Sequence, residues 1–163
     1  MKRLILMRHA KSDWSTGARG DHDRPLNDRG RRGAAALGDW LRGEGLTPDA
    51  VLCSSATRTR ETLAGLGLPD GVPVDFTRDL YLATHDDMLQ VLRGATGDCV
   101  LVLGHNPGIS IAACELPADL PDHPRFEAFP TGATLVVDFD IDDWRDADWG
   151  TGRARQFTVP RDL

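Results

Sequence analysis

The chain has 163 residues, of which 40% are hydrophobic and 27% are charged, a balance typical of a folded soluble protein and not of a disordered or fibrous one. The formal net charge of −6 argues against a general binder of nucleic acid or anionic membranes, although a local cluster of arginines could still bind an anionic substrate. We expect a single domain over residues 1–163, because no linker or internal repeat divides the chain.

The predicted elements alternate between strand and helix along the chain. Short apolar runs predict strands over residues 2–8, 50–54, 72–76, 99–103, 133–139 and 155–159. Helical periodicity predicts helices over residues 26–46, 57–66, 86–92 and 107–116, with helix caps at Asn27 or Asp28, at Ser54 or Ser55, and at Asn106. Such alternation predicts a three-layer α/β/α fold, in which helices cover both faces of a mostly parallel central sheet.

Three of the predicted strands end in residues that suit phosphate chemistry. The first ends in Arg8-His9, the second leads into a segment that contains Arg58, and the fourth leads into His105. Because function gathers at the carboxyl ends of parallel strands, we expect these four side chains to meet at one edge of the sheet. Two guanidinium groups facing two imidazole rings repel one another unless an anion lies between them, and arginine binds phosphoryl oxygens bidentately. The pattern therefore predicts a phosphoryl-binding site.

The segments around these residues resemble motifs of the histidine phosphatase superfamily. Arg8-His9-Ala10 looks like the first motif of that family, residues 54–62 resemble its second arginine motif, and residues 104–107 resemble its second histidine motif. The resemblance covers about residues 2–110, with the motifs in the family's order and spacing. The short length and the opening of the chain are most similar to the SixA-type phosphohistidine phosphatases.

The resemblance implies a histidine-phosphatase-like fold and a reaction through a phosphorylated histidine. His9 would attack phosphorus in line, while Arg8, Arg58 and His105 hold the phosphoryl oxygens, with His105 acting as a cation. The second ring nitrogen of His9 is expected to donate to a backbone carbonyl, which fixes the tautomer. We expect no metal and no cofactor, because the positive charge lies on the chain itself.

Three further positions complete the expected site. Ser15 falls where relatives with sugar-phosphate substrates carry an asparagine, and Asn106 follows the second histidine; we expect both to bind substrate. Phosphoglycerate-mutase-like relatives place a proton-donating glutamate between the second and third motifs, but this chain has none between Thr62 and Gly104. Asp79 is the nearest substitute for that proton donor, and a turn or cap aspartate is an equally good interpretation.

The missing glutamate favours a phosphohistidine substrate. An alkoxide leaving group needs a positioned acid, whereas an imidazole takes up a proton near neutral pH and leaves as a neutral ring. The chain is also short, which leaves few residues for a cap over a small metabolite. We therefore expect a phosphatase that acts on protein phosphohistidine. The alternative is a small-molecule phosphomonoesterase of the same superfamily that uses Asp79.

Other classes of protein fit the sequence less well. A cysteine phosphatase needs a Cys-x5-Arg motif, and none of the three cysteines (Cys53, Cys99 and Cys114) is followed by arginine at that spacing. A phospho-ligand binding module without catalysis would keep the arginines and lose His9, which is present. A phosphomutase needs a strong acid–base carboxylate to shuttle the phosphoryl group.

Location and partners are inferred from what the sequence lacks. The chain contains no CxxC pair, so its cysteines indicate neither a zinc site nor a disulfide framework. No apolar run approaches the roughly 20 residues of a membrane span. The apolar run before Arg8 is too short for the core of a signal peptide. We expect a cytoplasmic monomer that has no nucleic-acid or membrane partner. Its expected partner is a phosphorylated protein or a small phosphate ester.

Overall fold

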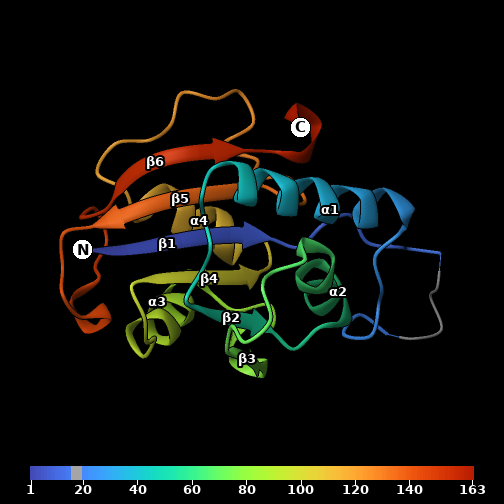
Figure 1. Cartoon of the computed structure of the whole chain (residues 1–163), viewed down its shortest axis with the longest axis horizontal. Coiled ribbons are helices and arrows are strands. Elements are labelled where there is room, and N and C mark those ends of the chain that lie inside the picture. The colour runs from blue at the N-terminus through green and yellow to red at the C-terminus, as the bar shows by residue number, and fades with distance from the viewer. Residues whose placement is uncertain (16–19) are drawn as a thin grey trace.

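The computed structural model describes residues 1–15 and 20–163, and this part of the chain forms one six-stranded central sheet (Figure 1). The strands are β1 (Lys2–Arg8), β2 (Ala50–Ser54), β3 (Val74–Thr77), β4 (Cys99–Gly104), β5 (Thr134–Phe139) and β6 (Arg153–Thr158). They lie in the order β3-β2-β4-β1-β5-β6. Neighbours are parallel from β3 to β1, whereas β5 is antiparallel to both β1 and β6. The sheet is therefore mostly parallel, as the sequence predicts.

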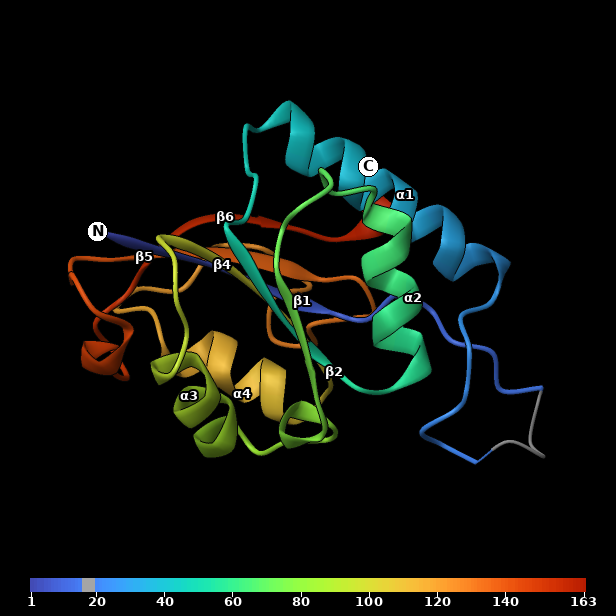
Figure 2. The ribbon, with the colours of Figure 1, turned by 60° about the horizontal axis from the view of Figure 1, so that its bottom comes forward.

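Helices cover both faces of this sheet, which confirms the three-layer prediction (Figure 2). α1 (Asp28–Gly43) and α2 (Thr57–Leu66) pack on one face, and α3 (His85–Arg93) and α4 (Gly108–Glu115) pack on the other. β1 serves both cores, because Ile5 and Met7 face the α1 side while Leu4 and Leu6 face the α4 side. This double burial explains why the strand is continuously apolar. Among the described residues, no helix is long and apolar enough to cross a membrane.

The long helix α1 forms where the sequence predicts it. Its N-cap is Asn27, whose side-chain oxygen accepts a hydrogen bond from the Gly30 N–H at 2.8 Å. Ala34, Leu37 and Leu41 follow at helical spacing and are buried against the sheet. Cap and apolar face thus agree, and the helix begins within two residues of the predicted position.

Two other predicted helix caps are wrong. The side chain of Asn106 donates to the backbone carbonyls of residues 128–129, so it does not cap α4. The N-cap of α2 is Ala56, which offers no side-chain bond. The hydroxyl groups of Ser54 and Ser55, predicted to cap this helix, instead form hydrogen bonds with histidine side chains. In both cases the side chain that the local sequence predicts to cap the helix binds a residue far away in the sequence instead.

The third strand also begins later than predicted, at Val74. Pro73 has no N–H to donate to a sheet, although its carbonyl accepts from the Val51 N–H at 2.9 Å just before the strand starts. β3 is therefore a short edge strand with an exposed face.

Helices α1 and α2 meet at glycines, and this contact predicts a large effect of one methyl group. A Cβ on Gly38 would lie 2.1 Å from the Leu66 carbonyl oxygen, whereas a Cβ on Gly43 would meet nothing within 4 Å. We expect Gly38→Ala to lower the free energy of unfolding in urea by about 2–3 kcal/mol, because the helices must move apart. The control Gly43→Ala should be neutral or slightly stabilising. Equal stabilities of the two variants would contradict this account of the packing.

Candidate active site

Three strand ends bring two arginines and two histidines together. His9 directly follows β1 and His105 directly follows β4, and the His9 N–H donates to the Gly104 carbonyl at 3.2 Å. The centroids of the two imidazole rings are 5.4 Å apart. Arg58, at the start of α2 just beyond β2, and Arg8, at the end of β1, are close enough for their charges to act on both rings. The structure thus places these four side chains at one edge of the sheet.

The His9 ring is buried and held in one orientation. Its Nδ1 lies 2.7 Å from the carbonyl oxygen of Ala10, and a carbonyl can only accept, so Nδ1 carries the proton. The remaining nitrogen, Nε2, therefore bears a lone pair when the ring is neutral. Burial lowers the pKa of His9 to about 3, although the bond to Ala10 acts in the opposite direction. The ring is consequently neutral at physiological pH.

His105 is also buried but uses its nitrogens differently. Its Nε2 lies 2.7 Å from the hydroxyl oxygen of Ser54, and that oxygen accepts from the Ala56 N–H at 3.3 Å. Nδ1 has no hydrogen-bond partner among the described residues. Burial, followed by the charge of Arg58, lowers the pKa of His105 to about 3, so the ring is neutral in the unliganded protein. If Ser54 donates to Nε2, the neutral ring presents its Nδ1–H as a free donor.

These two histidines make the folded state sensitive to acid. Each ring has a pKa near 3 when folded and near 6.5 when unfolded, so between these values the unfolded chain binds more protons. The stability is complete above about pH 6.5 and is lost as the pH falls, by about 1.4 kcal/mol per pH unit for each histidine. Between pH 7 and pH 5, we therefore expect His105→Asn to lose about 2 kcal/mol less unfolding free energy than wild type, measured by urea titration. Identical losses in the two proteins would contradict the low pKa.

The two arginines are held by different contacts. Arg58 is only 2% exposed and donates from Nη1 to the Asp21 carbonyl (2.7 Å) and from Nη2 to the Asp21 carboxylate (3.0 Å). Arg8 donates from Nη1 to the Phe129 carbonyl at 3.2 Å, and the same carbonyl accepts from the side chain of Asn106 at 3.1 Å. The Nε atoms of Arg8 and Arg58 are buried and have no partner among the described residues. Unpaired donors on cationic groups create a site that favours an anion with several acceptor oxygens.

A backbone conformation that the sequence does not reveal directs the Phe129 carbonyl. Phe129 has a φ of 43°, in the left-handed region that costs a side-chain-bearing residue energy, while its ring is fully buried. The buried ring anchors the residue, and its carbonyl can then accept from both Arg8 and Asn106. Asn106 therefore acts on the position of Arg8 through this shared carbonyl.

Asp21 and Tyr81 join the site although sequence reasoning did not select them. Asp21 forms ion pairs with Arg58 (3.0 Å) and Arg24 (3.1 Å), and it accepts a hydrogen bond from the Tyr81 hydroxyl. Burial would raise the pKa of Asp21, but these three donors together hold it well below the ordinary value. The Tyr81 ring packs edge-on against His105, with centroids 5.5 Å apart. An aspartate in a polar loop carries no sequence signal for this role, because only folding brings Asp21 to the start of α2.

The side chain of Thr62, the last residue of the second arginine motif, makes two hydrogen bonds that link the motif to the His9 segment. Its hydroxyl donates to the Arg58 carbonyl at 2.7 Å and accepts from the Ala10 N–H at 3.0 Å. This side chain therefore ties the first turns of α2 to the segment that follows His9. It fixes the spacing between the arginine and the histidine without touching the space between them.

Two predicted site residues lie apart from the cluster. Ser15 is exposed and donates its hydroxyl to the Asp13 carboxylate at 2.6 Å. Asp79 is exposed in a short 3-10 turn (Arg78–Leu80), where its backbone N–H donates to the Thr77 hydroxyl at 3.0 Å. Within residues 1–15 and 20–163, no hydrogen bond links either side chain to the four central residues. Over the same ranges, no group of three or more His, Cys, Asp or Glu residues is arranged to hold a metal ion.

The fold and this cluster define a class of phosphoryl-transfer enzyme, and comparison with known proteins identifies it. Residues 4–81 match the family model of the histidine phosphatase superfamily, branch 1. An uncharacterised protein of Mycobacterium tuberculosis is 38% identical over 162 residues, covering 95% of this chain and 100% of that protein. The chain belongs to the histidine phosphatase superfamily and is a phosphatase.

Solved structures support this placement over the full length. A candidate phosphohistidine phosphatase SixA from Nakamurella multipartitia is 32% identical, with a TM-score of 0.85 over 98% of this chain and 96% of that one. A corresponding SixA candidate from Agrobacterium tumefaciens is 25% identical, with a TM-score of 0.78 over 98% of both chains. The similarity therefore includes the elements that carry the candidate site.

Proposed function

We propose that the protein removes phosphoryl groups from phosphohistidine side chains of other proteins, through a phosphorylated intermediate on His9. The observation that carries this proposal is the state of the His9 ring. Its Nδ1–H donates to Ala10 at 2.7 Å, and burial keeps the ring neutral, so Nε2 is available as a nucleophile. Two guanidinium groups lie close enough for their charges to act on this ring, and Nδ1 of His105, without a partner among the described residues, adds a third donor when it carries the proton.

The reaction would proceed in two displacement steps. In the first, Nε2 of His9 attacks phosphorus, a phosphorus–nitrogen bond forms, and the bond from phosphorus to the substrate imidazole breaks. In the second, water attacks phosphorus, the bond to His9 breaks, His9 returns to its neutral form, and dihydrogen phosphate leaves with both protons of the water. Arg8, Arg58 and His105 would stabilise the charge on the three non-bridging oxygens in both steps. A dianion beside His105 would raise its pKa and strengthen that hydrogen bond.

The substrate class follows from the absence of a positioned acid. Among the described residues, the carboxylate that bonds to the four central side chains is Asp21, through Arg58. Its low pKa keeps it ionised and unable to donate a proton. Asp79 is exposed, and its side chain makes no hydrogen bond to the cluster. An alkoxide leaving group would therefore lack a donor, whereas a phosphohistidine can be protonated on its second ring nitrogen before the bond breaks. Because Arg8, Arg58 and His105 supply the charge stabilisation, we also propose that the reaction needs no metal.

A comparison of three substrates tests this proposal. We expect kcat/KM for a phosphohistidine peptide to exceed that for phosphoserine, an alkyl phosphate, by about 100-fold or more, the usual contribution of a general acid. An aryl phosphate should also be cleaved, because its leaving group needs no acid. Asp79→Asn should change none of these values by more than about twofold, since an exposed side chain outside the cluster contributes little.

Two results would overturn the proposed function. One is a higher kcat/KM for the alkyl phosphate than for phosphohistidine, together with loss of that activity in Asp79→Asn. This outcome would instead assign a small-molecule phosphomonoesterase with Asp79 as its acid. The other is loss of wild-type activity in EDTA, which would contradict a metal-free mechanism.

A further inference from the structure

A basic pocket lies beside the candidate active site. It has a volume of about 140 Å³ and opens between the start of α1, the loop before β5 and the C-terminal turn. Four cationic side chains line it: Lys11, Arg29, Arg125 and Arg161. The lining residues within the described chain include no aspartate or glutamate. The protein as a whole is acidic, with 25 acidic and 19 basic residues, so the positive charge of this pocket is opposite in sign to the net charge.

The four cations are not used in the fold. Within residues 1–15 and 20–163, their side chains form no ion pair and donate no hydrogen bond. The acidic residues next to them in sequence bond elsewhere, because Asp28 pairs with Arg31 and Asp162 pairs with His123 at 2.8 Å. Four unpaired positive charges around one small pocket repel one another, and an anion bound between them would relieve that repulsion.

The chain is built closely around this pocket. A Cβ on Gly30 would lie 2.0 Å from the Lys11 carbonyl oxygen, so only glycine lets α1 approach the segment after His9. A Cβ on Gly33 would lie 3.6 Å from Pro160, which places the C-terminal turn (Pro160–Asp162) directly on α1. Two glycines one helical turn apart thus hold Lys11, Arg29 and Arg161 around the same space.

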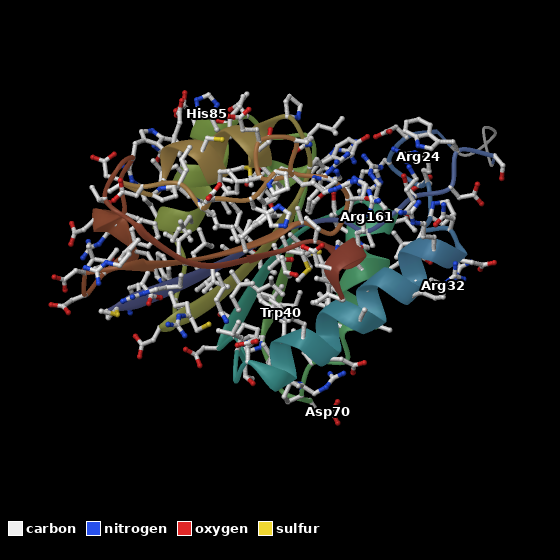
Figure 3. The ribbon with its side chains drawn as sticks, turned by 90° about the horizontal axis from the view of Figure 1, so that it is seen from above. Arg24, Arg32, Trp40, Asp70, His85 and Arg161 are labelled. Carbon is white, nitrogen blue, oxygen red and sulfur yellow. The ribbon has the colours of Figure 1, made fainter. Side chains whose placement is uncertain are left out.

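The pocket adjoins the phosphoryl site through the segment that follows His9. Ala10, whose carbonyl fixes the His9 ring, also lines the pocket. Lys11 is two residues from His9, so their Cα atoms are within about 7.6 Å. In Figure 3, Arg161 lies at the same end of the molecule as Arg24, which bonds to Asp21 beside Arg58. A substrate held at His9 could therefore reach the pocket with a neighbouring group.

We propose that this basic pocket binds a second anionic group of the substrate, a carboxylate or a phosphate, while the first phosphoryl group lies at His9. The identity of the substrate rests on the proposed function, under which the second anion is an acidic side chain close to the phosphohistidine. An extended peptide advances about 3.3 Å per residue, so glutamates two or three residues from the phosphohistidine would reach Lys11 and Arg29. The cations would also draw an acidic partner to a protein whose net charge repels it elsewhere.

The test measures binding through competition with 4-nitrophenyl phosphate, so that a compound that is not turned over still gives a value. The first pair of competitors is a phosphohistidine peptide with glutamates at the second and third flanking positions and the same peptide with glutamines. The second pair is fructose 1,6-bisphosphate and fructose 6-phosphate. The pocket variant is Arg29→Ala/Arg161→Ala, and the control is Arg32→Ala/Arg153→Ala, which removes the same charge from exposed positions outside the pocket. In Figure 3, Arg32 lies on the other side of α1 from Arg161.

In wild type, we expect the glutamate peptide to bind about tenfold more tightly than the glutamine peptide, the sum of a few exposed ion pairs. The pocket variant should reduce this ratio below about threefold, and the control should preserve it. Arg161→Glu, a single charge reversal, should reduce it as well. Thermal unfolding of each variant checks that these exposed substitutions leave the fold intact.

The two competitor pairs separate failure of the pocket from failure of the proposed function. In one possible outcome, neither peptide competes, the bisphosphate binds more tightly than the monophosphate, and the pocket variant removes that difference. This outcome would support the anion site and contradict the phosphohistidine substrate. Ratios near one for both pairs in wild type would overturn the pocket. So would ratios that survive in Arg29→Ala/Arg161→Ala.

Discussion

His9→Ala should lower kcat by about 10⁴-fold or more, as removal of a covalent nucleophile does in other enzymes that use one. The substitution removes the only atom in this account that bonds to phosphorus, the Nε2 atom that the Ala10 carbonyl leaves unprotonated. The arginines remain, so phosphate and substrate should still bind. The expected signature is therefore a loss in kcat with a much smaller change in the affinity for inorganic phosphate.

A matched control separates this effect from the loss of any histidine. His85 begins α3 on the opposite side of the sheet from α1, and His85→Ala should leave kcat unchanged (Figure 3). Thermal unfolding of both variants shows whether the fold survives. Wild-type activity in folded His9→Ala protein would exclude His9 as the nucleophile. The four central side chains would then bind the phosphoryl group without forming a bond to phosphorus.

Arg58→Ala is expected to cost about 2–4 kcal/mol of transition-state stabilisation, the effect of removing one preorganised donor. Arg58 is 2% exposed and is oriented by two bonds to Asp21, so its charge is fixed before substrate arrives. This cost corresponds to a loss of about 30-fold to 1000-fold in kcat/KM for an aryl phosphate. Arg58→Lys should recover little of it, because an ammonium group cannot reproduce the planar fork.

Arg60 provides the control on the same helix. Its side chain is exposed, donates to the Ser55 carbonyl at 2.9 Å and lies over the Phe76 ring at 4.1 Å. Arg60→Ala removes the same charge from α2 without touching the cluster, and kcat/KM should stay within about twofold of wild type. Equal losses in the two variants would mean that the helix carries only a general positive field, and not a specific contact from Arg58.

Much of this fold follows from local pattern. The apolar runs at β1 and β4 are buried on both faces, and their ends deliver His9 and His105 to one edge, as parallel strands require. Asn27 caps α1 because its Oδ1 stays free to accept from the Gly30 N–H, while its Nδ2 donates to the Ser12 carbonyl. Such elements are predictable because the interactions that form them lie within a few residues of one another.

The parts of the site that sequence could not predict depend on distant segments. Asp21 reaches Arg58 only because residues 21 and 22 lie against the start of α2, where the Thr57 N–H donates to the His22 carbonyl at 3.0 Å. The Phe129 carbonyl has no sequence signature, because every residue carries that group. Asn106 looks like a helix cap but donates to this distant carbonyl, and Ser15, expected to bind substrate, bonds to its neighbour Asp13.

The central claim is that the phosphoryl group passes through His9, and rapid quenching tests it most directly. The enzyme is mixed with excess phosphohistidine peptide, quenched in alkali within the first turnover, digested and mapped by mass spectrometry. Alkaline quenching preserves a phosphorus–nitrogen bond that acid would hydrolyse. We expect one phosphoryl group on the peptide that contains His9, formed in a burst and absent from His9→Ala. A phosphoryl group on any other residue, or an unchanged burst in His9→Ala, would contradict the central claim.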